Sequence, residues 1–248
     1  MSITAEFAEI FAEFTQISIS SKQLIACMDL TLLDEQADVA ALLKLKEKAE
    51  TAQVAAVCVY PQHLSIFSPL KPIELATVIN FPTGTENLAK SLEQILAAKE
   101  FGATEIDYVL PYSNYLSGQH GQALEACQAV WHLCHSEQLT LKVIIETGAF
   151  ADLEILYNLS LELIDIGCDF LKTSTGKISQ GASLPAAFTI LKAIQYKQKP
   201  VGLKVSGGIK TPTQAQEYAQ LAELMLSKPI DKTWFRIGAS SLLDALSD

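Results

Sequence analysis

The chain has 248 residues, 49% of them hydrophobic, which suits one α/β barrel or two small domains with a sizeable core. Its formal net charge is −10, and with a single arginine, Arg236, and no basic stripe it is a poor candidate for nucleic-acid binding. No apolar run reaches the roughly 18 residues of a membrane span, and five isolated cysteines without a signal peptide indicate a reducing, cytoplasmic compartment.

Short apolar runs alternate with longer helical patterns along the chain. An acidic amphipathic pattern predicts an N-terminal helix over Met1–Phe14. Eight runs, most of them rich in Val, Ile and aromatic residues, predict strands at Leu24–Leu30, Val54–Tyr60, Leu75–Phe81, Glu105–Leu110, Leu141–Thr147, Phe170–Ser174, Val201–Ser206 and Trp234–Ala239. Patterns with one polar face predict helices at Asp34–Thr51, Glu86–Phe101, Gln119–Ser136, Asp152–Ile166, Leu184–Tyr196, Pro212–Leu226 and Leu242–Leu246.

The predicted strands begin on average about 30 residues apart, which is the size of a βα unit. Eight such units without a linker predict an α/β protein with a (β/α)8 TIM barrel. We expect a single domain, with residues 24–248 forming the barrel and residues 1–20 forming an extra N-terminal helix and its lead-in. A doubly wound open sheet is the alternative, although open sheets seldom show eight equal repeats.

Two lysines stand on short apolar strands, and each strand leads into a Gly/Ser/Thr-rich loop. Lys172 lies in Phe170–Ser174 and Lys204 lies in Val201–Ser206. Burial disfavours the charged amine, and two neighbouring lysines also disfavour each other's charge, so the pKa falls toward neutrality. Either lysine alone is more often structural, snorkelling to solvent or pairing with an acid. Together they predict amine chemistry on a carbonyl compound.

Other polar residues stand on the predicted strands, on the side that strand alternation turns into a barrel. Asp107 is either a proton shuttle for carbinolamine chemistry or the salt-bridge partner of a core lysine. Lys142 begins its strand, which fits an ion pair at the barrel floor. Cys58 fits the core, and Asn80 is either a turn residue or a substrate contact.

Two glycine-rich loops follow the seventh and eighth predicted strands. Ser206-Gly207-Gly208 and Gly238-Ala239-Ser240-Ser241 occupy the place where barrel enzymes often bind phosphate, and Thr175, Gly176 and Lys177 add a hydroxyl, a backbone N–H and a charge. The alternative is that these glycines only form tight turns. His132, Cys134 and His135 have the look of metal ligands, but no carboxylate completes the set, so we expect no metal site.

With these residues in view, the chain closely resembles the deoxyribose-phosphate aldolases, a family of class I aldolases. Lys142–Gly148 and Leu171–Lys177 are the most specific matching segments. The others follow in family order over about 28–241 and comprise Met28–Thr31, Val57–Pro61, Val78–Pro82, Glu105–Asp107, Pro111–Tyr112, Lys204 with Gly207–Gly208, and Arg236–Ser241.

The resemblance implies reversible cleavage of 2-deoxy-D-ribose 5-phosphate to D-glyceraldehyde 3-phosphate and acetaldehyde, within deoxyribonucleotide and deoxynucleoside catabolism, without a metal or organic cofactor. It implies that Lys172 forms the Schiff base, that Lys204 perturbs it and that Asp107 relays protons through a water. It also places Asp29 and Cys58 near the substrate. The implied phosphate and substrate cradle comprises Gly176, Lys177, Gly207, Gly208, Gly238, Ser240 and Ser241.

The chain departs from this family in two places. It ends at Asp248, so we expect it to lack the family's flexible tail with a terminal tyrosine, which assists proton transfer at the donor methyl carbon. We expect the lyase reaction to remain and the proton exchange to be slower or to use another group. Lys210 stands where relatives often carry arginine, which keeps the charge but loses the fork geometry.

Two other functions compete with this one. The first is a different class I Schiff-base aldolase that acts on another phosphosugar, and the second is a phosphosugar-binding barrel without catalysis. A binding protein has no need of two desolvated amines, which favours an enzyme. The sequence leaves the oligomeric state open; a homodimer is one option, and the N-terminal helix would either cover the barrel floor or meet a partner.

Overall fold

The structure is a computed structural model that describes residues 2–12 and 18–247. Across these residues, eight parallel strands pair in sequence order and close into a barrel, with the last strand paired to the first. The strands are β1 (Met28–Leu32), β2 (Ala56–Val59), β3 (Glu74–Ile79), β4 (Glu105–Val109), β5 (Thr140–Ile144), β6 (Phe170–Lys172), β7 (Gly202–Ser206) and β8 (Phe235–Ala239). The predicted (β/α)8 TIM barrel is therefore confirmed.

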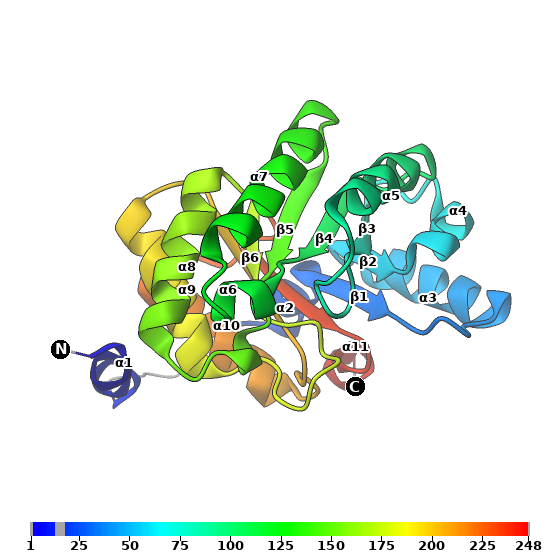
Figure 1. Cartoon of the computed structure of the whole chain (residues 1–248). Coiled ribbons are helices and arrows are strands. Elements are labelled where there is room, and N and C mark those ends of the chain that lie inside the picture. The colour runs from blue at the N-terminus through cyan, green and yellow to red at the C-terminus, as the bar shows by residue number, and fades with distance from the viewer. Residues whose placement is uncertain (1, 13–17, 248) are drawn as a thin grey trace.

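Helices surround the barrel (Figure 1). The long ones are α3 (Val39–Ala52), α5 (Leu88–Glu100), α7 (His120–Ser136), α8 (Leu153–Ile166), α9 (Leu184–Lys197) and α10 (Pro212–Leu226). Shorter elements are α2 (Ser21–Ala26), α4 (Leu64–Phe67), α6 (Tyr112–Leu116), α11 (Leu242–Ser247) and the 3₁₀ turns η1 (Pro61–His63) and η2 (Thr147–Ala149). No helix within the described residues is long and apolar enough to cross a membrane.

Side chains placed just before the long helices explain where these helices begin. Asp38 accepts a hydrogen bond from the backbone N–H of Ala41 at the start of α3, and Ser183 accepts one from Ala186 at the start of α9. At α10, Thr211 and Gln214 form a reciprocal capping box. These caps satisfy N–H groups that a helix leaves unpaired in its first turn.

The first predicted strand, Leu24–Leu30, is wrong in its first half. Residues Ser21–Ala26 form the helix α2, and β1 begins only at Met28. Ser20 and Gln23 form a capping box, so a helix start overrides the apolar pattern. The helix α2 packs against α10 and α11.

The extra N-terminal helix is present as α1 (Ile3–Ala12). Residue 1 and residues 13–17, which include the predicted end of this helix, lie outside the described residues. The helix contacts the outer helices α8 and α9 rather than the barrel floor. Phe7 packs on Phe188 of α9, and Glu6 pairs with Lys192 of the same helix.

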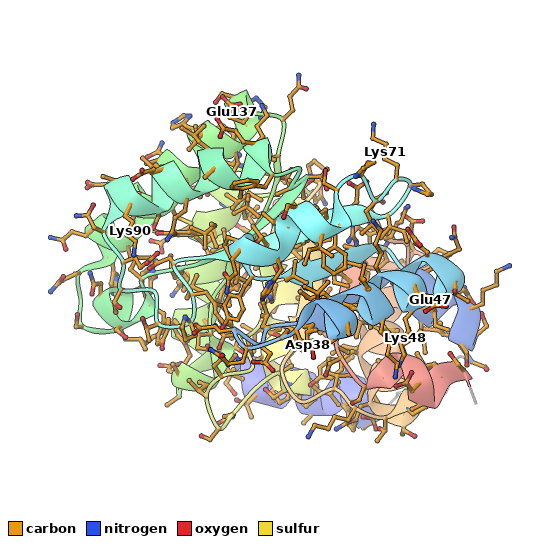
Figure 2. All side chains as sticks on the ribbon, turned by 90° about the vertical axis from the view of Figure 1, so that its right-hand side faces the viewer. Asp38, Glu47, Lys48, Lys71, Lys90 and Glu137 are labelled. Atoms are coloured by element: carbon orange, nitrogen blue, oxygen red, sulfur yellow. The ribbon has the colours of Figure 1, made fainter. Side chains whose placement is uncertain are left out.

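Strand alternation separates an apolar outer side of the barrel from a polar inner side. Outward residues such as Val143, Leu171 and Leu203 are fully buried in the core between the strands and the helices. Inward residues include charged groups that are equally buried, among them Asp107 and Lys204. Figure 2, by contrast, shows Glu47, Lys48 and Lys90 on the outer surface of the helices, where a charge stays in water. The barrel interior is therefore the unusual electrostatic environment of this molecule.

Candidate active site

The strand register brings the predicted lysines side by side. Lys172 on β6 is the direct partner of Lys204 on β7, and Lys204 is the partner of Arg236 on β8. Across the barrel, Asp107 on β4 is paired with Lys142 on β5. Because partner residues in neighbouring parallel strands point to the same side, these five side chains share the interior.

Asp107 lies between three lysines. Its Oδ2 atom is 2.7 Å from Nζ of Lys172 and 2.7 Å from Nζ of Lys204, and its Oδ1 atom is 3.0 Å from Nζ of Lys142. Burial alone would raise the pKa of Asp107, but the three ammonium groups hold it well below the usual range. Asp107 is therefore a carboxylate that receives hydrogen bonds from both predicted catalytic lysines.

The two lysines differ in pKa. Burial and the neighbouring charge of Lys204 lower the pKa of Lys172, and the contact with Asp107 only partly opposes this. Burial would also lower the pKa of Lys204, but Asp107 and Asp29 outweigh it and raise that pKa. The sequence predicts a lowered pKa for both lysines. In the structure only the pKa of Lys172 is lowered, because a second carboxylate, Asp29, lies beside Lys204 and raises its pKa.

Asp29 and Cys58 lie inside the barrel rather than in the open cleft. Oδ2 of Asp29 forms an ion pair with Nζ of Lys204 at 2.5 Å, although the angles do not fit a hydrogen bond. Oδ1 of Asp29 accepts a hydrogen bond from Arg236 at 2.7 Å. Cys58 packs with Ala76 and Val78, and burial raises the pKa of its thiol to about 11. Asp29 is thus an ion-pair member, and Cys58 is a neutral core thiol at neutral pH.

A cleft of about 360 Å³ opens at the carboxyl ends of the strands and has Lys172 in its wall. Most of the predicted cradle lines it, namely Thr175, Gly176, Lys177, Gly207, Gly208, Gly238 and Ser240, together with Lys210. Ser241 is not part of this lining. The structure thus brings Lys172 and the glycine-rich loops to one cleft, while Asp107 and Lys204 lie behind Lys172.

Close backbone contacts hold the loops after β6 and β7 together. Gly207 has a φ of +89°, and its Cα lies 3.5 Å from the position that a Cβ on Gly176 would take. A Cβ on Gly181 would collide with the carbonyl oxygen of Gly207. Sequence reasoning missed Gly181, although it stands alone in a polar segment just before the helix cap Ser183.

Hydrogen bonds from buried polar side chains fix the same loops. Ser206 donates through Oγ to the carbonyl oxygen of Ser174 at 2.6 Å, and Thr173 donates to the carbonyl oxygen of Ser206 at 3.0 Å. Glu146 has left-handed backbone with a φ of 62°, and its carboxylate accepts from the hydroxyl and the N–H of Thr175. The sequence analysis did not reveal this contact.

Asn80, for which the sequence left two interpretations, is a turn residue. Its side chain donates to the carbonyl oxygen of Val109 at 2.8 Å and accepts from the N–H of Glu86 at 2.7 Å. Its φ of 58° is one that asparagine tolerates better than most residues. The described residues contain no group of three or more His, Cys, Asp or Glu side chains that would suit a metal ion.

Comparison with known proteins relates this fold and site to one family. The sequence model of the family described as DeoC/LacD family aldolase matches residues 23–247. A deoxyribose phosphate aldolase from Aeropyrum pernix, described as tetrameric, superposes with a TM-score of 0.78 at 24% identity over 98% of this chain and 96% of that one.

Two further solved structures share the fold. A Coccidioides immitis protein provisionally named a deoxyribose-phosphate aldolase has a TM-score of 0.82 at 22% identity over 99% of this chain and 97% of that one. A Toxoplasma gondii ME49 protein of the same provisional name has a TM-score of 0.80 at 20% identity over 92% and 94%. The structures show the common fold, and the family match over nearly the whole chain shows the relationship. The chain therefore belongs to the DeoC/LacD family of aldolases, which are carbon–carbon lyases.

Proposed function

We propose that this aldolase cleaves 2-deoxy-D-ribose 5-phosphate reversibly to D-glyceraldehyde 3-phosphate and acetaldehyde through a Schiff base on Lys172. The observation that carries the proposal is the state of Lys172, a buried amine with a lowered pKa in the wall of the cleft and 2.7 Å from Asp107. A lowered pKa increases the unprotonated fraction of the amine, and the unprotonated amine is the form that attacks an aldehyde.

The chemistry follows from the positions of three side chains. Neutral Lys172 adds to C1 of the open-chain aldehyde, and Asp107 moves protons through water while the carbinolamine loses water to form an iminium. The C2–C3 bond breaks when a base takes the proton of the C3 hydroxyl, and its electron pair passes to the iminium to form an enamine. Protonation of the enamine and hydrolysis release acetaldehyde and regenerate Lys172. Lys204, whose pKa is raised, keeps a proton beside the same oxygen of Asp107.

The cleft supports a phosphorylated substrate. Lys177 and Lys210 are the lysines of its lining besides Lys172, and the backbone of Gly207, Gly208 and Gly238 approaches it without side chains. Backbone N–H groups and lysines suit a phosphate where no arginine is available, since Arg236 is buried in the interior. The same lining leaves a related phosphosugar as the alternative substrate, and a panel of phosphosugars separates the two.

Reductive trapping tests the proposal. The protein is mixed with acetaldehyde or deoxyribose 5-phosphate plus borohydride, and its intact mass and peptides are measured. We expect a reduced two-carbon adduct with acetaldehyde on the peptide that contains Lys172, and cleavage of deoxyribose 5-phosphate without added metal. Binding of the phosphosugar without an adduct or turnover would instead support a non-catalytic barrel.

Gly181→Ala is expected to weaken the use of phosphorylated substrates. The new Cβ collides with the carbonyl oxygen of Gly207, so the backbone of Gly207 in the cleft wall or the segment around Gly181 must shift. We expect KM for deoxyribose 5-phosphate to rise about tenfold or more, whereas the slow cleavage of unphosphorylated deoxyribose changes little. Gly121→Ala is the matched control, since nothing lies within 4 Å of its Cβ position. Equal losses on both substrates would contradict a role in phosphate binding.

A further inference from the structure

Six charged side chains in the barrel interior form a closed ring of ion pairs. Going around it, each carboxylate touches a cation on either side: Asp107–Lys204 at 2.7 Å, Lys204–Asp29 at 2.5 Å, Asp29–Arg236 at 2.7 Å, Arg236–Glu105 at 3.0 Å, Glu105–Lys142, and Lys142–Asp107 at 3.0 Å. A longer contact of 3.7 Å between Lys142 and Asp29 crosses it. We refer to these six residues as the charge ring. All of them are at least nine-tenths buried.

The charge ring has no net charge, since it contains three carboxylates and three cations. Each member has at least two neighbours of opposite sign, which offsets the cost of removing a charge from water. The three acidic members come from β1 and β4, and the three basic members come from β5, β7 and β8. The ring is thus built by strands from both halves of the barrel.

Lys172 stands outside this balance. Among the described residues it has one ion-pair partner, Asp107, and that carboxylate is already shared by Lys142 and Lys204. Cys58 on β2 lies near Lys172 but is a neutral thiol, because burial raises its pKa to about 11. Glu146, just after β5, interacts electrostatically with Lys172 but lies beyond ion-pair distance; its carboxylate accepts hydrogen bonds from Thr175, and burial raises its pKa, which weakens it as a counter-charge. A proton on Lys172 would therefore add an uncompensated charge.

We propose that Arg236, Glu105 and Lys142 are positioning residues of the aldol reaction, because they complete a neutral charge ring that leaves a proton on Lys172 without a balancing carboxylate of its own. The proposal rests on the proposed function of Lys172 and assigns roles to three residues that do not line the cleft. The aromatic ring of Phe170 packs against Arg236, 5.5 Å from its guanidinium carbon, and Gly202 leaves the space that this aromatic ring fills.

The neutral charge ring also affects the later step of the reaction. An iminium on Lys172 is a cation that the ring does not balance, whereas the enamine formed by breaking the C2–C3 bond is neutral. The ring therefore favours bond cleavage over accumulation of the iminium, in the direction that the reaction requires.

Two single variants change the charge of the ring in opposite directions. Arg236→Gln leaves the ring negative, so Lys172 binds its proton more tightly. The acid limb of the pH profile, which is the rise in trapping of acetaldehyde as Lys172 loses its proton, is then expected about 1 pH unit higher. Glu105→Gln leaves it positive, so the limb moves down by a similar amount. The double variant has a neutral ring again, and its limb is expected close to that of the wild type.

The readout is the pH dependence of reductive trapping of acetaldehyde on Lys172, followed by peptide mass, together with kcat/KM for deoxyribose 5-phosphate. Arg236→Lys keeps the positive charge but loses the guanidinium that contacts both Asp29 and Glu105. The acid limb of this variant is expected to stay at the wild-type pH even if its stability falls. Asp165→Asn is the control, because Asp165 pairs with Lys197 and Lys199 on the surface. Its limb is expected not to move.

Two outcomes would overturn the proposal. In one, both single variants lose rate but their acid limbs stay at the wild-type pH. In the other, the acid limb of the double variant moves further from the wild-type pH instead of returning to it. A wild-type protein that traps acetaldehyde but does not cleave deoxyribose 5-phosphate would overturn only the substrate assignment, since the trapping profile still reports the state of Lys172. A wild-type protein without any adduct would overturn the proposed function itself.

Discussion

Lys172→Met is expected to abolish aldol cleavage while leaving the protein as stable as the wild type, or more stable by about 1 kcal/mol. The nucleophile is lost, so kcat/KM should fall by about 10⁴-fold or more, and the borohydride adduct should disappear. Stability should not fall, because methionine fills a similar volume and removes a buried amine whose burial has no counter-charge of its own. Activity assays and urea unfolding at pH 7 measure the two effects.

Lys142→Met is the matched comparison. Both lysines are buried on neighbouring strands, but Lys142 contacts Glu105 and Asp107, and Lys172 contacts Asp107 alone. Removing Lys142 leaves Glu105 with one partner instead of two, so we expect a loss of about 3 kcal/mol in the free energy of unfolding. If both methionine variants lose stability equally, the distinction between a balanced and an unbalanced lysine is wrong.

Asp107→Asn is expected to lower both activity and stability. The amide cannot accept and return protons as a carboxylate does, which should reduce kcat by about 10²- to 10⁴-fold. It also leaves Lys142, Lys172 and Lys204 without the carboxylate they share, which should cost about 3–5 kcal/mol of stability at pH 7. Asp165→Asn, on the protein surface, is expected to change stability by less than about 1 kcal/mol.

The stability difference at Asp107 should depend on pH. The pKa of Asp107 in the folded protein lies well below its unfolded value of about 3.9. Its carboxylate therefore contributes its full stability above about pH 5, and this contribution is lost as the pH falls through the folded pKa. Urea unfolding of wild type and Asp107→Asn at pH 7, 5 and 3 should show stabilities that converge as the pH falls. A difference that grows toward low pH would contradict the ion-pair account.

The fold could be predicted from the sequence because each βα unit repeats the same local pattern. The predicted start of a strand at Glu105 and the predicted end of a helix at Ile166 coincide with the bounds of β4 and α8. The start of the first strand could not be predicted in this way, because Leu24 and Ile25 are apolar but follow a capping box. The capping box of Ser20 and Gln23 marks the start of a short helix, but the apolar residues that follow it suggest a strand when the pattern is read alone.

The inward position of the charged residues could also be predicted, since alternation along a strand needs no tertiary information. Which charges touch each other could not. The sequence identifies Arg236 as the single arginine and as the start of a family-like segment, whereas its contacts with Asp29 and Glu105 depend on how the barrel closes. The difference in pKa between Lys172 and Lys204 depends on the same closure, because Asp29 forms an ion pair with Lys204 and not with Lys172 in the described structure.

The pairing of β8 with β1 has a consequence for assembly of the protein. In Figure 1 the red C-terminal part of the chain lies beside the blue strand β1. Arg236 comes from the last strand and Asp29 from the first, so the charge ring is complete only after the two ends of the barrel meet. Before that, an intermediate that lacks β8 holds buried acids in excess over the bases of the ring, and its Lys172 is drawn toward the protonated state. A barrel without β8 would thus carry Lys172 without the charge balance on which its proposed reactivity depends, which ties catalysis to the pairing of β8 with β1.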